Sequence, residues 1–140
     1  QFEMVRDLAG NGHTVRLFAM HPFSVGGDDR RLARRICRRI LKECGPETAA
    51  LVSYAKLPMS PLEILSAMAK ARFTVAMRFH SVLFAEHMEV PYVAVDYTCG
   101  GKIHAFLHER GEADRLSTLD HLIGGEVTAT ILQRLHPLPK

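Results

Sequence analysis

The chain alternates short apolar runs with segments whose apolar residues recur at helical spacing. Residues 73–77 form the clearest short run: they are apolar or β-branched and follow a basic break, a pattern typical of a buried strand. Runs of the same kind occupy residues 13–20, 49–54, 73–77, 92–97 and 115–119. Because these runs are continuous rather than alternating, they favour a parallel sheet that is covered on both faces.

Amphipathic segments lie between the runs and predict helices. They occupy residues 2–9, 29–42, 61–69, 81–88, 102–110 and 127–135. The start signal of the last helix is either Asp120 or Gly124-Gly125. The clearest start signal is Ser60-Pro61 with Glu63, which combines an N-cap serine, a proline at the first helical position and a glutamate three residues after the cap. Strands that alternate with helices in this way predict an α/β fold, a Rossmann-like parallel sheet with helices on both faces.

Composition and length fit one globular domain. The chain has 140 residues, of which 47% are hydrophobic and 24% charged. It contains no apolar stretch long enough to cross a bilayer and no charged-then-apolar leader, so we expect a cytoplasmic protein. The three cysteines, an odd number without metal-type spacing, fit reduced thiols. The chain starts at Gln1 without an initiator methionine, which suggests a fragment of a longer polypeptide.

Arg78 and His80 are the first candidates for chemistry. They follow the strand predicted at residues 73–77 and precede the helix expected from Ser81. In an open α/β sheet this turn lies at the carboxyl end of the strand, where ligands bind and where helix N–H groups favour an anion. A guanidinium binds phosphate or carboxylate in a bidentate way, and an imidazole can donate a proton near neutral pH. The pair suits a phosphorylated carboxylic acid, and the alternative is a surface ion pair with a helix-capping histidine.

Four further candidates lie at other strand ends or at a helix start. His21 and Asp96-Tyr97 end two other predicted strands, so in a parallel sheet they would share an edge with Arg78. Lys102 opens the next helix after Gly100-Gly101, a glycine pair that could let the backbone approach a phosphate. A structural or merely exposed role remains the alternative for each, because strand ends are commonly polar.

Three other patterns carry weaker signals. His104 and His108 have zinc-ligand spacing, but the protease glutamate and a cysteine pair are missing, so we expect no metal. Cys99 has no assigned histidine base. The arginine-rich side of the helix at residues 29–42 suggests a nucleic-acid or membrane surface, whereas a solvated helix face is the simpler interpretation, since no aromatic residues are interleaved and the net charge is only +3. We therefore expect no nucleic-acid partner and no stable membrane insertion.

Residues from about 51 to 111 resemble the C-terminal domain of the polysaccharide pyruvyl transferase family. The resemblance rests on Arg78-Phe79-His80-Ser81 after an apolar strand, which matches the family's arginine, any residue, histidine, serine. Val90-Pro91 and the apolar strand after it also match, as do Tyr97 and Lys102, although residues 98–101 make the spacing of that last pair longer here. The segment from residue 12 to 41 fits more loosely.

The resemblance implies a fold, a reaction and a set of site residues. Residues 1–140 would be the C-terminal Rossmann-like domain of a two-domain, glycosyltransferase-B-like enzyme, with the N-terminal domain and the first strand of this domain outside the sequence. The reaction would move a pyruvyl group from phosphoenolpyruvate to a saccharide acceptor of a cell-envelope or exported polysaccharide, without a metal or other cofactor. Arg78 would hold the donor's phosphate or carboxylate, and His80 would be the general acid or a phosphate ligand. The candidate substrate-binding residues are Arg78, Ser81, His21, Asp96, Tyr97 and Lys102.

Two other functions stay open. The same architecture could be a half-domain of a sugar-nucleotide glycosyltransferase or epimerase, because fold alone does not choose between them. Alternatively, the chain could be a truncated, non-catalytic domain that binds a sugar polymer or a partner, and we expect no turnover from this chain alone. A missing central strand would leave strand edges unpaired, so we also expect a homo-oligomer.

Overall fold

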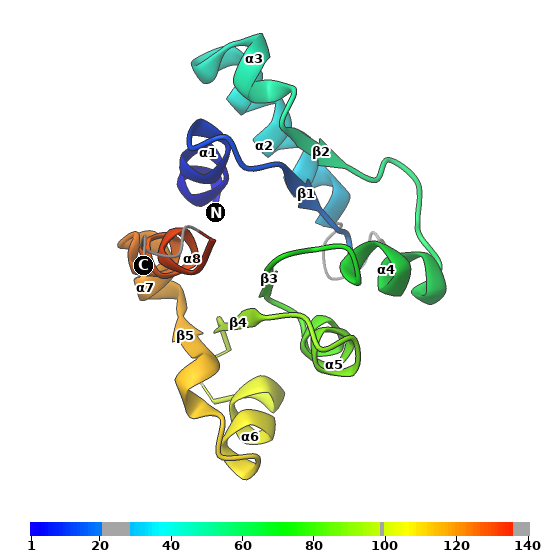
Figure 1. Cartoon of the computed structure of the whole chain (residues 1–140), viewed down its shortest axis with the longest axis vertical. Helices are drawn as coiled ribbons and strands as arrows, with labels where there is room; N and C mark the ends of the chain where they lie inside the picture. Colours follow the sequence, from blue (N-terminus) through cyan, green and yellow to red (C-terminus); the bar gives the residue numbers. More distant parts are fainter. Residues whose placement is uncertain (21–28, 99, 136–140) are drawn as a thin grey trace, which may run out of the picture. The chain divides into compact units, whose positions relative to one another are not determined.

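The computed structural model describes residues 1–20, 29–98 and 100–135 (Figure 1). The chain divides into two compact units, Gln1–Pro61 and Leu62–Lys140. Among the described residues, the strands form two separate parallel ladders, one in each unit. The strands are β1 (Val15–Leu17), β2 (Val52–Tyr54), β3 (Thr74–Ala76), β4 (Tyr92–Asp96) and β5 (Leu116–Thr118). The predicted α/β class with parallel strands is confirmed.

The first unit buries one face of each of its two long helices, α1 (Phe2–Gly10) and α2 (Asp29–Cys44). The buried residues of α2 repeat at intervals of three and four, so they form one stripe along the helix. That stripe packs with residues of α1 and β2 in a cluster made of Phe2, Val5, Ala9, Ile36, Ile40 and Val52. A short helix, α3 (Pro46–Ala49), connects α2 to β2.

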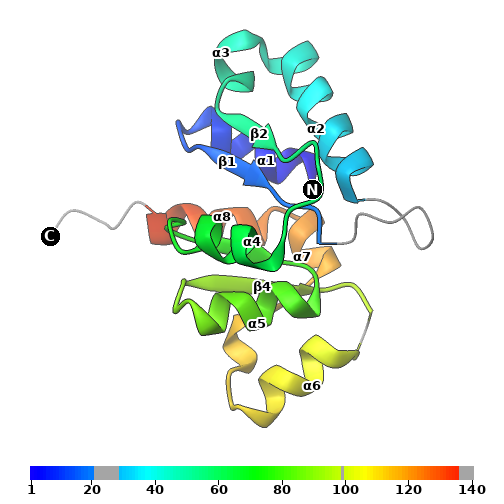
Figure 2. The ribbon, with the colours of Figure 1, turned by 90° about the vertical axis from the view of Figure 1, so that its right-hand side faces the viewer.

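The second unit is a three-stranded parallel sheet in the order β3-β4-β5. Helices α5 (Phe79–His87) and α6 (Lys102–Glu109) lie on one side of β4, and α7 (Leu119–Ile123) and α8 (Glu126–Leu135) lie on the other (Figures 1 and 2). Helix α4 (Pro61–Met68) and the 3₁₀ turn η1 (Ala113–Arg115) complete the unit. All five residues of β4 are buried, as expected for a middle strand that is covered on both faces.

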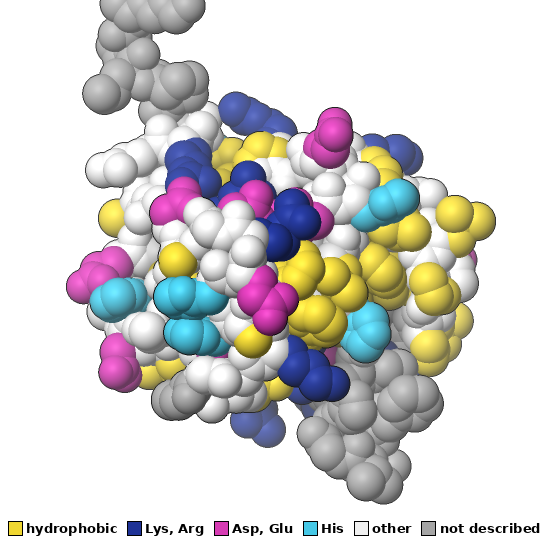
Figure 3. Space-filling model, turned by 90° about the horizontal axis from the view of Figure 1, so that it is seen from below, with side chains coloured by type: hydrophobic (Ala, Val, Ile, Leu, Met, Phe, Trp, Pro, Cys, Tyr) yellow, Lys and Arg dark blue, Asp and Glu magenta, His cyan; other side chains and the backbone are white. Residues whose placement is uncertain are grey.

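A polar network joins α5, β4 and the segment after α6. The Tyr92 hydroxyl donates to Glu86 Oε1 over 2.6 Å, and the guanidinium groups of Arg115 and Arg110 each lie 3.2 Å from a Glu86 oxygen. Burial and the hydrogen bond to Glu86 raise the pKa of Tyr92 to about 12. Seen from the side of α6, basic and acidic side chains lie next to each other on the surface (Figure 3). The network fixes the amino end of β4, opposite the end that carries Asp96.

Several boundaries differ from the sequence-based expectation. Helix α5 begins at Phe79, two residues before Ser81. The C-terminal region holds two helices, α7 and α8, where one was expected, and the short helix α3 was not predicted. Strand β1 ends at Leu17, four residues before His21. No helix within the described residues is long and apolar enough to span a membrane.

Candidate functional site

Arg78 is the residue from which α5 starts. It follows β3 and has an extended backbone, with φ of −121° and ψ of 145°, as an N-cap residue should. The Ser81 hydroxyl accepts a hydrogen bond from the Arg78 N–H over 3.2 Å and donates one to the Arg78 carbonyl over 2.6 Å. Ser81 is the third residue of the helix and is only 7% exposed. Its two hydrogen bonds to Arg78 stabilise the start of the helix. This contact explains why the helix begins at Phe79 and not at Ser81.

The Arg78 side chain connects the ends of two neighbouring strands. Its Nη1 donates to the Tyr97 hydroxyl over 2.8 Å, and its guanidinium carbon lies 5.8 Å from the centroid of the Tyr97 ring. Tyr97 is the first residue after β4, which pairs in parallel with β3. The structure thus brings Arg78 and Tyr97 together at the carboxyl edge of the sheet, where α/β folds bind ligands.

His80 lies in the first turn of α5 with an exposed side chain. The residue before it, Phe79, packs edge-on against Phe106 of α6 with ring centroids 5.7 Å apart. This aromatic contact anchors the start of α5 against α6. His80 is therefore presented to solvent on a fixed turn, two residues after Arg78.

Asp96, the last residue of β4, holds the turn that leads into α6. Its Oδ1 accepts hydrogen bonds from the N–H and the hydroxyl of Thr98 over 2.8 and 2.6 Å, and its Oδ2 accepts one from the Gly100 N–H over 3.2 Å. Burial alone would raise the pKa of Asp96, but the bonds from Thr98 and from the backbone of Gly100 and Gly101 outweigh it and lower the pKa below its usual value. This ionised carboxylate is committed to the turn.

The family model for polysaccharide pyruvyl transferase matches residues 4–98, more than half of the chain. The chain belongs to the polysaccharide pyruvyl transferase family. Neither a curated protein nor a solved structure matches it. The matched span contains Arg78, His80, Ser81, Asp96 and Tyr97.

The substrate-binding residues predicted for this pyruvyl transferase family member also include Lys102 and His21. Lys102 is exposed and is the first residue of α6, after the N-cap Gly101, and it lies beyond the matched span. His21 lies outside the described residues, as does Cys99. The substrate-binding roles of Lys102 and His21 stay predictions.

The histidine pair with zinc-ligand spacing lies on α6. The rings of His104 and His108 lie 4.2 Å apart between centroids, with their planes tilted by 30°. In the described part of the chain, no group of three or more His, Cys, Asp or Glu side chains could hold a metal ion. The pair therefore gains no further ligand from the residues that the structure describes.

Thr98 is a site-shaping residue that the sequence analysis did not single out. Its hydroxyl bonds to Asp96, and a Cβ on Gly101 would overlap that same oxygen. The signal was present in the spacing, because an aspartate that bonds to backbone N–H two residues later is a common turn motif. Thr98 and Gly101 therefore lie close together just before α6.

Proposed function

We propose that this chain supplies one part of a site that transfers a pyruvyl group from phosphoenolpyruvate to a saccharide. Membership of the polysaccharide pyruvyl transferase family supports the reaction class. The observation that carries the choice of donor is the bond between Arg78 Nη1 and the Tyr97 hydroxyl, at the ends of two parallel strands and at the start of α5. That bond orients a permanently charged fork at a helix N-terminus, where both the guanidinium and the helix favour an anion.

The proposed chemistry assigns the two principal residues different tasks. Arg78 binds the phosphate or the carboxylate of phosphoenolpyruvate, and His80 gives a proton to the methylene carbon, which becomes a methyl group. A first sugar hydroxyl forms a bond to the neighbouring carbon and loses its proton. A second hydroxyl then attacks the same carbon and gives up its proton to the phosphate, which leaves with the electrons of the broken C–O bond. The products are a pyruvate ketal and inorganic phosphate.

The surrounding residues position this pair. Tyr97 orients the Arg78 guanidinium, Ser81 braces the start of α5, and Asp96 orders the turn before α6. Lys102, at the start of α6, adds a second cation for the anionic donor. Its place after the ordered turn supports this role, because the turn fixes where α6 begins.

Binding of the donor tests the proposal directly. Isothermal titration calorimetry of the chain with phosphoenolpyruvate is expected to show binding that falls about 10- to 100-fold in Arg78→Ala, because hydrogen bonds to charged groups are worth roughly 1.5–3 kcal/mol. Arg72→Ala is the matched control. Arg72 is exposed and its guanidinium bonds to the Leu135 carbonyl over 3.1 Å, so its loss should leave donor affinity unchanged.

The same titrations separate the other functions. A chain that binds a uridine nucleotide but not phosphoenolpyruvate would be a glycosyltransferase-type half-domain, and the proposal would be wrong. A chain that binds saccharide fragments and neither donor would be a binding domain. Release of inorganic phosphate in the presence of phosphoenolpyruvate and saccharide would report transfer itself.

A further inference from the structure

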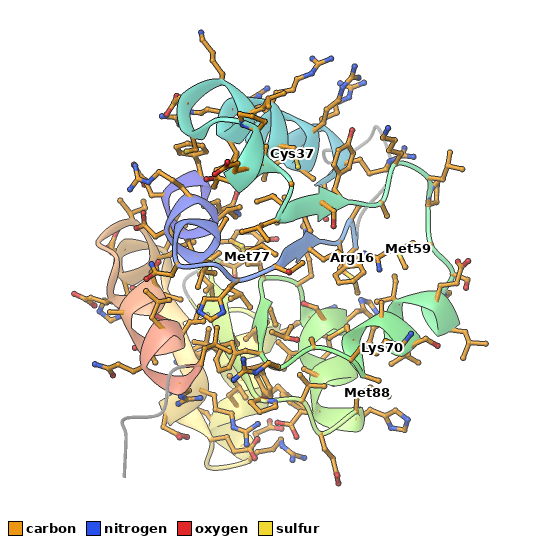
Figure 4. All side chains as sticks on the ribbon, turned by 45° about the horizontal axis from the view of Figure 1, so that its top comes forward. Arg16, Cys37, Met59, Lys70, Met77 and Met88 are labelled. Carbon is orange, nitrogen blue, oxygen red and sulfur yellow. The ribbon has the colours of Figure 1, made fainter. Side chains whose placement is uncertain are left out.

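The outer face of α2 is the most strongly charged surface feature that the proposed function does not use. We define the basic face as Arg31, Arg34, Arg35, Arg38 and Lys42. These five residues lie on the side of α2 away from its buried stripe of Ala33, Ile36 and Ile40. From residue 30 to residue 42 the sequence contains seven basic residues and no acidic one. Figure 4 shows nitrogen-tipped side chains that project outward from this helix.

Two leucines accompany the basic face. Leu41 is 54% exposed and lies three residues after Arg38 and seven after Arg34, on their side of the helix. Leu32 is 40% exposed and lies three residues before Arg35 and seven before Arg39, on the opposite flank of the basic face from Leu41. Apolar side chains exposed beside several cations are what an interfacial helix presents to a lipid headgroup layer.

A surface hollow borders one of these leucines. It has a volume of about 170 Å³ and is lined by Gln1, Phe2, Leu32, Arg35, Ile36 and Arg39. The Arg39 guanidinium carbon lies 3.7 Å from the centroid of the Phe2 ring, and its Nε bonds to Glu43 over 2.7 Å. The hollow therefore combines apolar side chains, which suit an acyl chain, with guanidinium groups, which suit the phosphate attached to it.

We infer that the basic face of α2 docks this chain on an anionic phospholipid surface. The face and the headgroup phosphates have complementary charge, and the exposed leucines reach toward the acyl boundary. The buried stripe of α2 stays in the core of the first unit, so the helix rests on the membrane and does not insert. A nucleic acid is the less favoured polyanion, because α2 carries no aromatic residue on which a base could stack. The inference does not depend on the choice of donor.

Vesicle flotation tests the inference with the complete chain. At low salt the chain is expected to bind vesicles of phosphatidylglycerol mixed with phosphatidylcholine and not vesicles of phosphatidylcholine alone. The triple variant Arg31→Gln, Arg38→Gln, Lys42→Gln should bind the anionic vesicles about 100-fold more weakly, since each cation near such a surface contributes roughly a fivefold factor. Raising the ionic strength should weaken binding of the unmodified chain as well.

A matched control removes the same charge elsewhere. Arg16→Gln, Lys56→Gln, Lys70→Gln changes three exposed cations outside α2 and outside the candidate site, so it should lose less than about tenfold. The labelled Arg16 and Lys70 are shown in Figure 4. Equal losses in the two triple variants would mean that binding follows net charge, and the inference would be overturned. Failure of the unmodified chain to bind anionic vesicles would overturn it too.

The leucine separates a membrane from a soluble polyanion. Leu41→Ser is expected to weaken vesicle binding about tenfold and to leave binding to a DNA duplex unchanged. If the duplex binds more tightly than the vesicles at equal phosphate concentration, or if Leu41→Ser has no effect on vesicle binding, the partner is not a lipid surface. Circular dichroism of each variant verifies that its fold is intact.

Discussion

Asp96 shows how a single side chain couples the order of the site to pH. Asp96 is 8% exposed, and its carboxylate accepts three hydrogen bonds from Thr98 and Gly100, which lower its pKa relative to the unfolded chain. A lowered pKa means that the unfolded state binds the proton more readily. The resulting stabilisation is present above the unfolded pKa of about 3.9 and is lost as the pH falls through the lower folded value.

Replacing Asp96 with asparagine removes this charge without changing the shape of the side chain. We expect Asp96→Asn to lower the free energy of unfolding by about 1–2 kcal/mol at neutral pH, because its amide group would face the Gly100 N–H, donor against donor. The difference from the unmodified chain should shrink as the pH falls below about 4, where the carboxylate of the unfolded chain takes up a proton, and further as the pH falls through the lower folded pKa. Urea unfolding at both pH values measures it.

The control for this prediction is an aspartate without such bonds. Asp114→Asn changes an exposed carboxylate and should alter the free energy of unfolding by less than about 0.5 kcal/mol. A difference for Asp96→Asn that stays constant between neutral and acidic pH would contradict the account of its hydrogen bonds.

At the candidate site, the sequence predicts where the side chains lie along the chain but not which groups they bond to. The order of apolar and polar positions correctly predicts that Arg78, Asp96 and Tyr97 follow or end strands. It does not predict that Tyr97 bonds to Arg78 while Asp96 bonds to Thr98, since both depend on side-chain directions that only the folded turn sets. Strand-end position is read from the chain, whereas the partner of each side chain is not.

At the scale of elements, the turn between β4 and α6 depends on a glycine for space. The Gly101 backbone has φ of −80°, which any residue can adopt, yet an added Cβ would overlap the Thr98 hydroxyl that bonds to Asp96. We expect Gly101→Ala to lower the free energy of unfolding by roughly 1–3 kcal/mol, as overpacking does. Thermal unfolding followed by circular dichroism measures this loss.

Two comparisons test the steric cause. Gly10→Ala, at the end of α1, adds a Cβ with no neighbour within 4 Å and should be neutral or stabilising by up to about 1 kcal/mol. In a Thr98→Ala background the overlapping oxygen is gone, so Gly101→Ala should cost less than it does alone. An equal cost in both backgrounds would rule out the overlap as the cause.

The helices differ in how clearly the sequence pattern predicts them. Long amphipathic stripes predict α1 and α2 because their buried residues repeat over several turns. The four residues of α3 are too few for any periodicity. Near the C-terminus, the start suggested after Gly124-Gly125 is that of α8, whereas α7 begins at Leu119, one residue before Asp120, with Thr118 as its N-cap. Gly125, with φ of 84°, separates the two helices. The sequence predicts a helix from Ser81, whereas α5 begins at Phe79 and Ser81, bonded to Arg78, is its third residue.

At the scale of the whole molecule, strand partners are the information that a local pattern lacks. Each apolar run predicts a strand, but nothing in a run states which other run it pairs with. In the described residues the strands form one two-stranded and one three-stranded ladder, so each ladder has outer strands with an edge of backbone donors and acceptors. Such edges are templates for pairing with another chain. We therefore predict that the chain self-associates.

Strand β1 offers a way to test this prediction without disturbing its own ladder. The Val15 N–H donates to the Leu51 carbonyl over 2.8 Å, and N–H groups alternate in direction along a strand, so the Arg16 N–H points away from β2. Multi-angle light scattering should give a mass above the 15.7 kDa of one chain that rises with concentration. Arg16→Pro removes the outward donor and should lower that mass, whereas Arg16→Ala removes only the side chain and should keep it. A single-chain mass at high concentration would contradict self-association, and equal masses for the two variants would show that the edge of β1 does not mediate it.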